Sequence, residues 1–208
     1  MIFYTSDLHF HYEPLLSERP FKSVEEMDEV LIGNWNKTVS SEDTVYVVGD
    51  IGYNDNRVPT DALRRLSGHK HLIRGNHDVG FDDAELLYDY FETVTDFNEI
   101  DDGDEHIILC HYPIIHNKRS VMVFGHLHAD PVNFHDIIRT LPKLNNCGVD
   151  VNGYRPVTLN ELKHNNDIFY HREGAEDLRP RHRRIHSGRG LMPKTPNFKP
   201  LPERPKGL

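Results

Sequence analysis

The sequence is poor in cysteine and has no long hydrophobic run. Two cysteines among 208 residues exclude a disulfide-stabilised scaffold and a four-cysteine zinc module, and they make a reducing environment the default expectation. No apolar stretch approaches the roughly 20 residues that a membrane-spanning helix needs. The first residues, Met1 to Asp7, lack the basic start and apolar core of a signal peptide. We therefore expect a soluble, cytoplasmic protein that does not contact a membrane.

Positive charge is scarce in most of the chain. Residues 1–170 hold 14 lysines and arginines against 29 aspartates and glutamates, a net charge of −15. Residues 171–208 hold 10 against 4, a net charge of +6, and they also hold six of the 13 prolines. The acidic part argues against a broad nucleic-acid-binding face on the body of the protein. We predict one folded domain over residues 1–170 and a basic, proline-rich, disordered tail over residues 171–208.

The tail allows two interpretations. It is either a solubilising or non-native extension, or a basic arm that binds RNA, DNA or an acidic partner. The composition leaves both open.

Hydrophobic patterning predicts alternating strands and helices in the first half of the chain and mostly strands in the second. Ser23 and Glu26 form a capping box that begins a helix with Trp35 on its apolar face. Further helices are predicted at 61–66, 82–91 and 158–163. Strands are predicted at 2–6, 44–48, 71–74, 93–100, 106–110, 120–124 and 144–151. This order suggests an α/β fold of two packed sheets with helices outside.

Potential metal ligands follow five of these strands. They are Asp7, His9, Asp50, Asn76, His111, His126 and His128. In open α/β sheets, the loops beyond the carboxyl ends of the strands form the ligand-binding crevice. Buried carboxylates and imidazoles are costly unless they are paired or bound to a metal. Seven such side chains in this order are hard to explain as core filling, and they predict a metal site.

At this point the sequence resembles the calcineurin-like metallophosphoesterases. The matching motifs are Asp7-Leu8-His9, Gly49-Asp50, Gly75-Asn76-His77-Asp78, His111 and Gly125-His126-Leu127-His128. The chain is most similar to the small bacterial and phage group of predicted phosphoesterases. This closer likeness rests on the segments Arg19-Pro20-Phe21, His71-Leu72-Ile73-Arg74, Gly148-Val149-Asp150-Val151 and Tyr154-Arg155-Pro156-Val157. The resemblance implies a four-layer α/β/β/α sandwich of two mixed sheets flanked by helices.

The resemblance also implies a dinuclear metal site. One metal would be held by Asp7, His9 and His128, the other by Asn76, His111 and His126, with Asp50 bridging the two. Two cations lower the pKa of a shared water and offset the charge of a phosphate, so that metal-bound hydroxide attacks the ester directly. Mixed nitrogen and oxygen ligands suit Mn, Fe, Zn, Ni or Co without choosing among them.

Two residues of the third motif have a separate expected role. The resemblance implies that His77 is not a ligand but protonates the leaving oxygen. Asp78 either orients the His77 ring or caps the following loop. In the protein Ser/Thr phosphatase branch, an Asp and an Arg follow the second motif where this chain has Tyr53 and Asn54, which disfavours protein phosphatase activity.

Four further residues are candidates for substrate binding. Arg74 and Arg119 could bind phosphate, because a guanidinium presents a two-pronged donor. His11 and His116 lie near motifs and could contact substrate, or they could be ordinary loop histidines.

We expect a metal-dependent phosphoester hydrolase that acts on diesters or monoesters of small molecules or nucleotides. Diesters are favoured because the chain is short, has no evident cap domain and should have an open site. One alternative is a metal-dependent nuclease or RNA-processing enzyme that uses the basic tail. A second is a catalytically silent scaffold, which the complete set of ligands and His77 disfavours. The oligomeric state is left open by the sequence.

Overall fold

Two four-stranded sheets form the centre of the molecule, within residues 1–52, 56–115, 119–129, 135–141 and 143–171 that the computed structural model describes. The first sheet has the order β1 (Ile2–Thr5), β2 (Thr44–Val47), β3 (His69–Ile73) and β4 (Thr93–Thr95). The second has the order β5 (Asn98–Asp102), β6 (Glu105–Leu109), β7 (Val121–Phe124) and β8 (Leu144–Asn146). The predicted tail, residues 171–208, lies outside the described residues apart from His171.

The first sheet is parallel throughout, and only the second is mixed. All three strand pairs of the first sheet are parallel, which corrects the expectation of two mixed sheets. Each connection in this sheet is long enough to carry helical turns, so that the chain crosses over and returns in the same direction. In the second sheet, β5 and β6 are antiparallel, whereas β6, β7 and β8 run parallel. A two-residue turn that begins at Gly103, with φ of 62°, joins the antiparallel pair.

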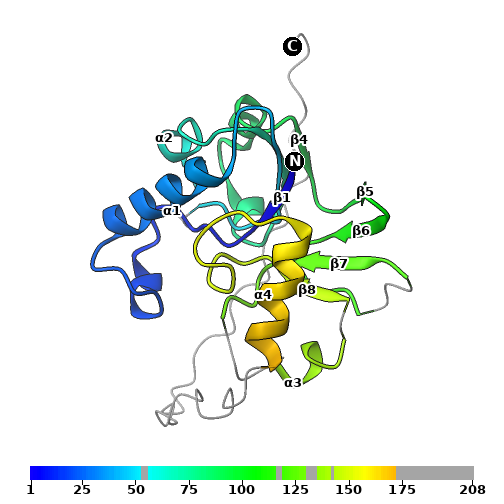
Figure 1. Cartoon of the computed structure of the whole chain (residues 1–208). Coiled ribbons are helices and arrows are strands. Elements are labelled where there is room, and N and C mark those ends of the chain that lie inside the picture. Colours follow the sequence, from blue (N-terminus) through cyan, green and yellow to red (C-terminus); the bar gives the residue numbers. More distant parts are fainter. Residues whose placement is uncertain (53–55, 116–118, 130–134, 142, 172–208) are drawn as a thin grey trace, which may run out of the picture.

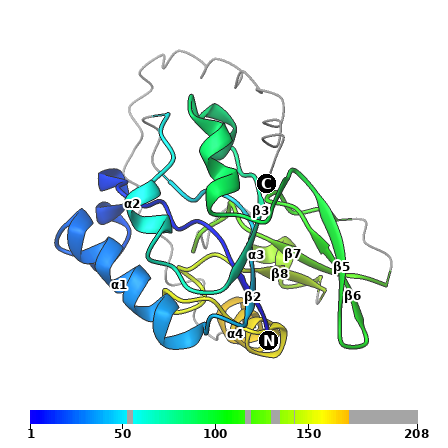
Figure 2. The ribbon, with the colours of Figure 1, turned by 90° about the horizontal axis from the view of Figure 1, so that it is seen from above.

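Helices cover the outer faces of the sheets, as the patterning predicted. Figure 1 shows α1 (Val24–Thr38) and α2 (Thr60–Leu63) on one side of the molecule and β5 to β8 on the other, and the view from above in Figure 2 agrees. Helix α4 (Leu159–His171) packs against β8, β1 and the short α3 (His135–Ile138). Three short 3₁₀ helices complete the description: η1 (Glu13–Ser17), η2 (Asp78–Gly80) and η3 (Ala84–Asp89). The helix predicted at 82–91 is therefore only the short η3.

Side chains alternate across the strands and build three apolar layers. In β1, Phe3 faces α1 and Tyr4 faces the second sheet; in β7, Val123 faces the first sheet and Met122 faces α3 and α4. This period of two is what places a core on both faces of each sheet. Trp35 of α1 is 1% exposed and belongs to the outer layer, as predicted. None of the described helices is both long and apolar enough to cross a membrane.

The start of α4 is stabilised by a charged cap. The carboxylate of Glu161 accepts hydrogen bonds from the backbone N–H and the hydroxyl of Thr158, both at 3.0 Å, and it pairs with Arg155 at 2.8 Å. The hydrogen bond from Arg155 and those from Thr158 lower the pKa of Glu161 to about 2 from its ordinary value of 4.5. Because the folded-state pKa is depressed, this contribution to stability is present above pH 4.5 and is lost as the pH falls towards 2.

The substitution Glu161→Gln should therefore destabilise the protein in a pH-dependent way. At pH 7 we expect a loss of about 0.5 kcal/mol, because the side chain of Glu161 is partly exposed and its ion pair is screened by solvent. Urea unfolding of both proteins at pH 7 and pH 3 should show the difference shrinking at the lower pH. Glu85→Gln, at an exposed position of η3, controls for the loss of one negative charge. A difference that is equal at both pH values would contradict the charged cap.

Candidate metal centre

The predicted ligands meet at one edge of the two sheets. Asp7 and His9 follow β1, Asp50 follows β2, and Asn76 follows β3, all parallel strands whose carboxyl ends lie together. His111 follows β6, and His126 and His128 follow β7 of the second sheet. The two sheets are joined at this edge, since Ser6 beyond β1 forms a parallel bridge with Gly148 beyond β8. The sequence expectation of a cluster at the strand ends agrees with this geometry.

The backbone is strained where the ligands lie. Five of the seven candidate ligands have left-handed backbone conformations, with φ between 47° and 70°: Asp7, His9, Asp50, His126 and His128. Each such non-glycine residue costs about 1–2 kcal/mol relative to an ordinary conformation. Strain of this kind persists only where the surroundings fix it, and it gathers at functional sites. The concentration of strain on the ligands points to a site shaped for binding.

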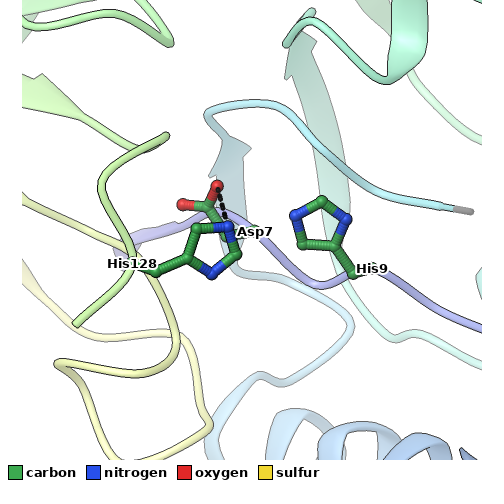
Figure 3. Close-up of side chains that lie close together, drawn as sticks. All are labelled: Asp7, His9 and His128. Carbon is green, nitrogen blue, oxygen red and sulfur yellow. Dashed lines mark ion pairs between the residues drawn. The ribbon is translucent and has the colours of Figure 1, made fainter. Parts of the chain in front are cut away.

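One half of the centre is formed by Asp7, His9 and His128. Figure 3 shows the three side chains facing a common space, and each offers one atom within 4.8 Å of the other two. The Nε2 atom of His128 lies 3.7 Å from Oδ1 of Asp7, and the rings of His9 and His128 stack with centres 5.0 Å apart. Ligands of one cation, each about 2.1 Å from it, lie no more than about 4.2 Å apart. Only a small contraction would bring these atoms onto one ion.

The other half contains Asp50, Asn76, His111 and His126. The Nε2 atom of His111 is 3.2 Å from Oδ2 of Asp50 and 3.1 Å from Oδ1 of Asn76, and Nδ1 of His126 is 3.0 Å from the same Asn76 oxygen. On its other side, His111 donates from Nδ1 to the main-chain oxygen of Val48 at 2.8 Å. Asp50 also lies 3.7 Å from His9 of the first half. Asp50 thus lies close to candidate ligands of both halves, and its bridging of two cations stays a prediction.

The protonation states of His9 and Asp50 suit cation binding. Both ring nitrogens of His9 are buried without a hydrogen-bond partner, and burial lowers the pKa of His9 to about 3. In a neutral imidazole, a bound cation would satisfy the buried ring nitrogen that carries the lone pair. Burial alone would raise the pKa of Asp50, but the hydrogen bond and charge of His111 hold it far below its ordinary value. Asp50 is therefore ionised, and the residues present fit a pair of divalent cations.

The comparisons with known proteins agree with this geometry. The family model of the calcineurin-like phosphoesterases matches residues 1–196. The chain belongs to this family. The resemblance inferred from the motifs is thereby confirmed, and family membership supports a phosphoester hydrolase.

Similar proteins come from an archaeon, a phage and a bacterium. An uncharacterized protein of Methanocaldococcus jannaschii is 32% identical over 163 residues, which cover 76% of this phosphoesterase and 86% of that protein. The gene 66 protein of Mycobacterium phage L5 is 29% identical over 158 residues, covering 61% and 76%. Among solved structures, the protein of unknown function AQ665 from Aquifex aeolicus superimposes with a TM-score of 0.63 and 26% identity, covering 79% of this chain and 98% of that one.

Asp78 differs from both of its expected roles. Its buried carboxylate accepts hydrogen bonds from the backbone N–H groups of Asp50 and Gly75, both at 2.8 Å, and of Ile51 at 2.9 Å. Burial and the nearby charge of Asp50 raise the pKa of Asp78 to about 7. Asp78 therefore ties the second motif to the third instead of orienting the ring of His77, whose buried Nδ1 has no hydrogen-bond partner.

Two substrate-binding candidates have protein partners that the sequence did not reveal. The guanidinium of Arg74 is buried and pairs with both oxygens of Asp96, at 2.8 and 3.0 Å. The ring of His11 lies between Asp28 at 2.7 Å and Asp61 at 3.0 Å, and the hydrogen bond to Asp28 raises its pKa to about 9 despite burial. Both groups are already neutralised by carboxylates, so the structure does not support phosphate binding by Arg74 or substrate contact by His11.

The structure leaves the other two substrate-binding candidates, Arg119 and His116, without a test. Arg119 is exposed, and its main-chain oxygen accepts a hydrogen bond from Lys143, so its role in substrate binding stays a prediction. His116 lies outside the described residues, as do Tyr53 and Asn54.

Four residues next to the centre were not among the site residues predicted from the sequence. The ring of Tyr12 is 5.4 Å from that of His9, and the ring of Tyr112 is 4.7 Å from that of His126. Asp150 bonds to His128, and Arg19 pairs with Asp150. Arg19 and Asp150 belong to segments that carry the closer family likeness, but nothing in their local sequence shows that they meet.

Glycine is required next to the centre, because backbone and carboxylate lie in contact there. A Cβ atom at Gly125 would come within 2.4 Å of Ser6 Oγ and 2.7 Å of Asp7 Oδ2, both in fully buried residues. We predict that Gly125→Ala destabilises the protein by about 1–3 kcal/mol through overpacking and weakens divalent metal binding. Thermal unfolding and metal titration would measure both effects. Gly33→Ala in α1, whose Cβ would meet nothing within 4 Å, should be neutral or stabilising, and an equal loss in both variants would refute the steric argument.

Proposed function

We propose that the protein is a dinuclear-metal phosphoesterase that hydrolyses phosphodiesters in preference to monoesters. The observation that carries the proposal is the arrangement of the candidate ligands in two sets around one buried carboxylate, Asp50. In the proposed assignment, Asp7, His9 and His128 hold one cation, and Asn76, His111 and His126 hold the other. When bound, two divalent cations lower the pKa of a shared water and offset the negative charge of the phosphate.

We propose Mn, Fe, Zn, Ni or Co as the metals, because the ligands mix nitrogen and oxygen. A cytoplasmic location and nucleic-acid binding by residues 171–208 remain sequence-based proposals.

We propose that His77 donates a proton to the leaving oxygen. Its backbone N–H donates to Oδ1 of Asp50 at 3.0 Å, which fixes its main chain beside the bridging ligand. Its ring lies edge-on to that of His9, with centres 4.9 Å apart. Nδ1 of His77 is buried and has no protein partner, so this nitrogen is not committed to another group of the protein. We assign to His77 the protonation of the leaving group.

The surrounding charge favours a diester over a monoester. A phosphate monoester carries about two negative charges at neutral pH, whereas a diester carries one. Arg19 and Arg74 are the buried arginines of the described residues, and carboxylates pair with both. They therefore add little net positive charge for a dianionic monoester.

The aromatic neighbours support the same preference. Tyr12 lies beside His9 and His77, whereas Tyr112, which is 40% exposed, lies beside His111 and His126. The two rings thus border opposite halves of the metal centre. A substituent on either side of the phosphorus atom could rest on one of them, which fits an ester with two organic groups.

Removal of the proposed acid should separate catalysis from metal binding. We predict that His77→Ala lowers kcat towards bis-p-nitrophenyl phosphate by about 100- to 10,000-fold while two metals remain bound per chain. The assay uses protein stripped with EDTA and reloaded with Mn²⁺, Ni²⁺, Zn²⁺ or Mg²⁺, and metal content is measured in parallel. His106→Ala removes an exposed histidine of the β5–β6 hairpin and should leave both quantities unchanged. Full activity of His77→Ala with metal present would exclude this role.

The preference for diesters has its own test. With the same metal, turnover of bis-p-nitrophenyl phosphate should exceed that of p-nitrophenyl phosphate, because the monoester leaves an additional charge uncompensated. Activity towards both esters should disappear with EDTA and return with metal. Faster turnover of the monoester would show that the preference is wrong. Two bound metals without activity towards either ester would instead indicate a narrow natural substrate or a scaffold.

A further inference from the structure

A buried ion pair lies directly behind one half of the metal centre. Asp150, in the turn after β8, accepts a hydrogen bond from Nδ1 of His128 at Oδ2, at 3.0 Å. The guanidinium of Arg19 pairs with the same carboxylate through Nε at 2.8 Å and NH2 at 2.9 Å. The side chains of Arg19 and Asp150 are 1% and 8% exposed. Both oxygens of Asp150 thus have a donor, and the carboxylate is held in one orientation.

Arg19 connects this pair to the backbone of the ligand loop. Its guanidinium also donates to the main-chain oxygens of Asp7 at 2.6 Å and Leu8 at 3.1 Å. Asp7 has a strained backbone, with φ of 56°. One arginine therefore stabilises the loop of the first ligand and orients the carboxylate that contacts His128.

The hydrogen bond to Asp150 determines which nitrogen of His128 faces the centre. A neutral imidazole has one N–H group and one lone pair. If Nδ1 donates to Asp150, the lone pair is on Nε2, the atom that lies 3.7 Å from Asp7 Oδ1. The other candidate ligand histidines differ. Nδ1 of His111 donates to a neutral main-chain oxygen, Nδ1 of His126 lies 3.0 Å from the amide oxygen of Asn76, and the ring nitrogens of His9 have no protein partner. Within the described residues, His128 is the candidate ligand histidine whose second nitrogen bonds to a carboxylate outside the ligand set.

We propose that Asp150, oriented by Arg19, is a positioning residue that makes the Asp7–His9–His128 half of the centre the tighter of the two metal positions. A carboxylate that accepts from a ligand histidine fixes its tautomer and raises its basicity, and loss of such a partner typically weakens metal binding 10- to 100-fold. The inference rests on the proposed metal centre and states which of its two positions binds a cation more tightly. The half that contains Asn76 and His111 has no comparable carboxylate behind its histidines among the described residues.

Calorimetric titration of EDTA-treated protein with Zn²⁺ tests this assignment. The wild type should bind two ions in two steps of different affinity. In Asp150→Asn, the tighter step should weaken by about 10- to 100-fold, and the weaker step should change little. Asp96→Asn is the matched control, because it removes a carboxylate from another buried arginine, Arg74, without a contact to a ligand histidine. Asp96→Asn should leave both steps unchanged.

A measurement on the wild type avoids a variant that fails to fold. Nitrogen-15 spectra of the Zn²⁺-loaded protein should show the side-chain proton of His128 on Nδ1. A proton on Nε2 would overturn the proposal, and so would two Zn²⁺ ions bound to Asp150→Asn with wild-type affinities. If the wild type binds no Zn²⁺ at all, the proposed metal centre itself fails, a result distinct from a Zn²⁺-binding wild type whose affinities do not depend on Asp150.

Discussion

The burial of two ionisable carboxylates at the end of a sheet is the constraint on which this structure depends. Asp7 and Asp50 are 0% and 2% exposed, and an unpaired carboxylate in such a place would be very costly. The surrounding chain offsets the cost with oriented donors: Ser6 Oγ and the His126 N–H donate to Asp7, and the His77 N–H donates to Asp50. These hydrogen bonds orient the two carboxylates, and they also hold the motifs of His77 and His126 in place.

The same constraint explains the strain and the glycines around the centre. Donors from both sheets can reach Asp7 and Asp50 only if the chain turns sharply after each strand, which places non-glycine residues in left-handed conformations. The close approach of backbone to carboxylate also leaves no room for a Cβ atom: one at Gly75 would lie 2.1 Å from Asp50 Oδ1. The apolar side chains on both faces of each sheet stabilise the fold, and this stability offsets the cost of the strained backbone.

Charge is distributed so that the arginines support the centre instead of binding a ligand themselves. Arg19 and Arg74 are each committed to a carboxylate, and Asp78 is committed to three backbone N–H groups. The contacts of Arg19 and Asp78 connect the segments that carry the candidate ligands. In the proposed function, the cations therefore compensate the charge of the phosphate group.

The sequence by itself determined the fold class, the edge of the sheets at which the site lies and the residues that gather there. It could do so because strand periodicity is local, and because polar residues that directly follow parallel strands must share one edge. Only the tertiary structure decided the partners of the long charged side chains. Arg74 follows a strand next to a motif and is suited to phosphate, but Asp96 after the neighbouring strand takes its guanidinium. Asp150 meets Arg19 across 131 positions of the chain. Such pairings depend on which elements pack together, and a local pattern carries no record of that packing.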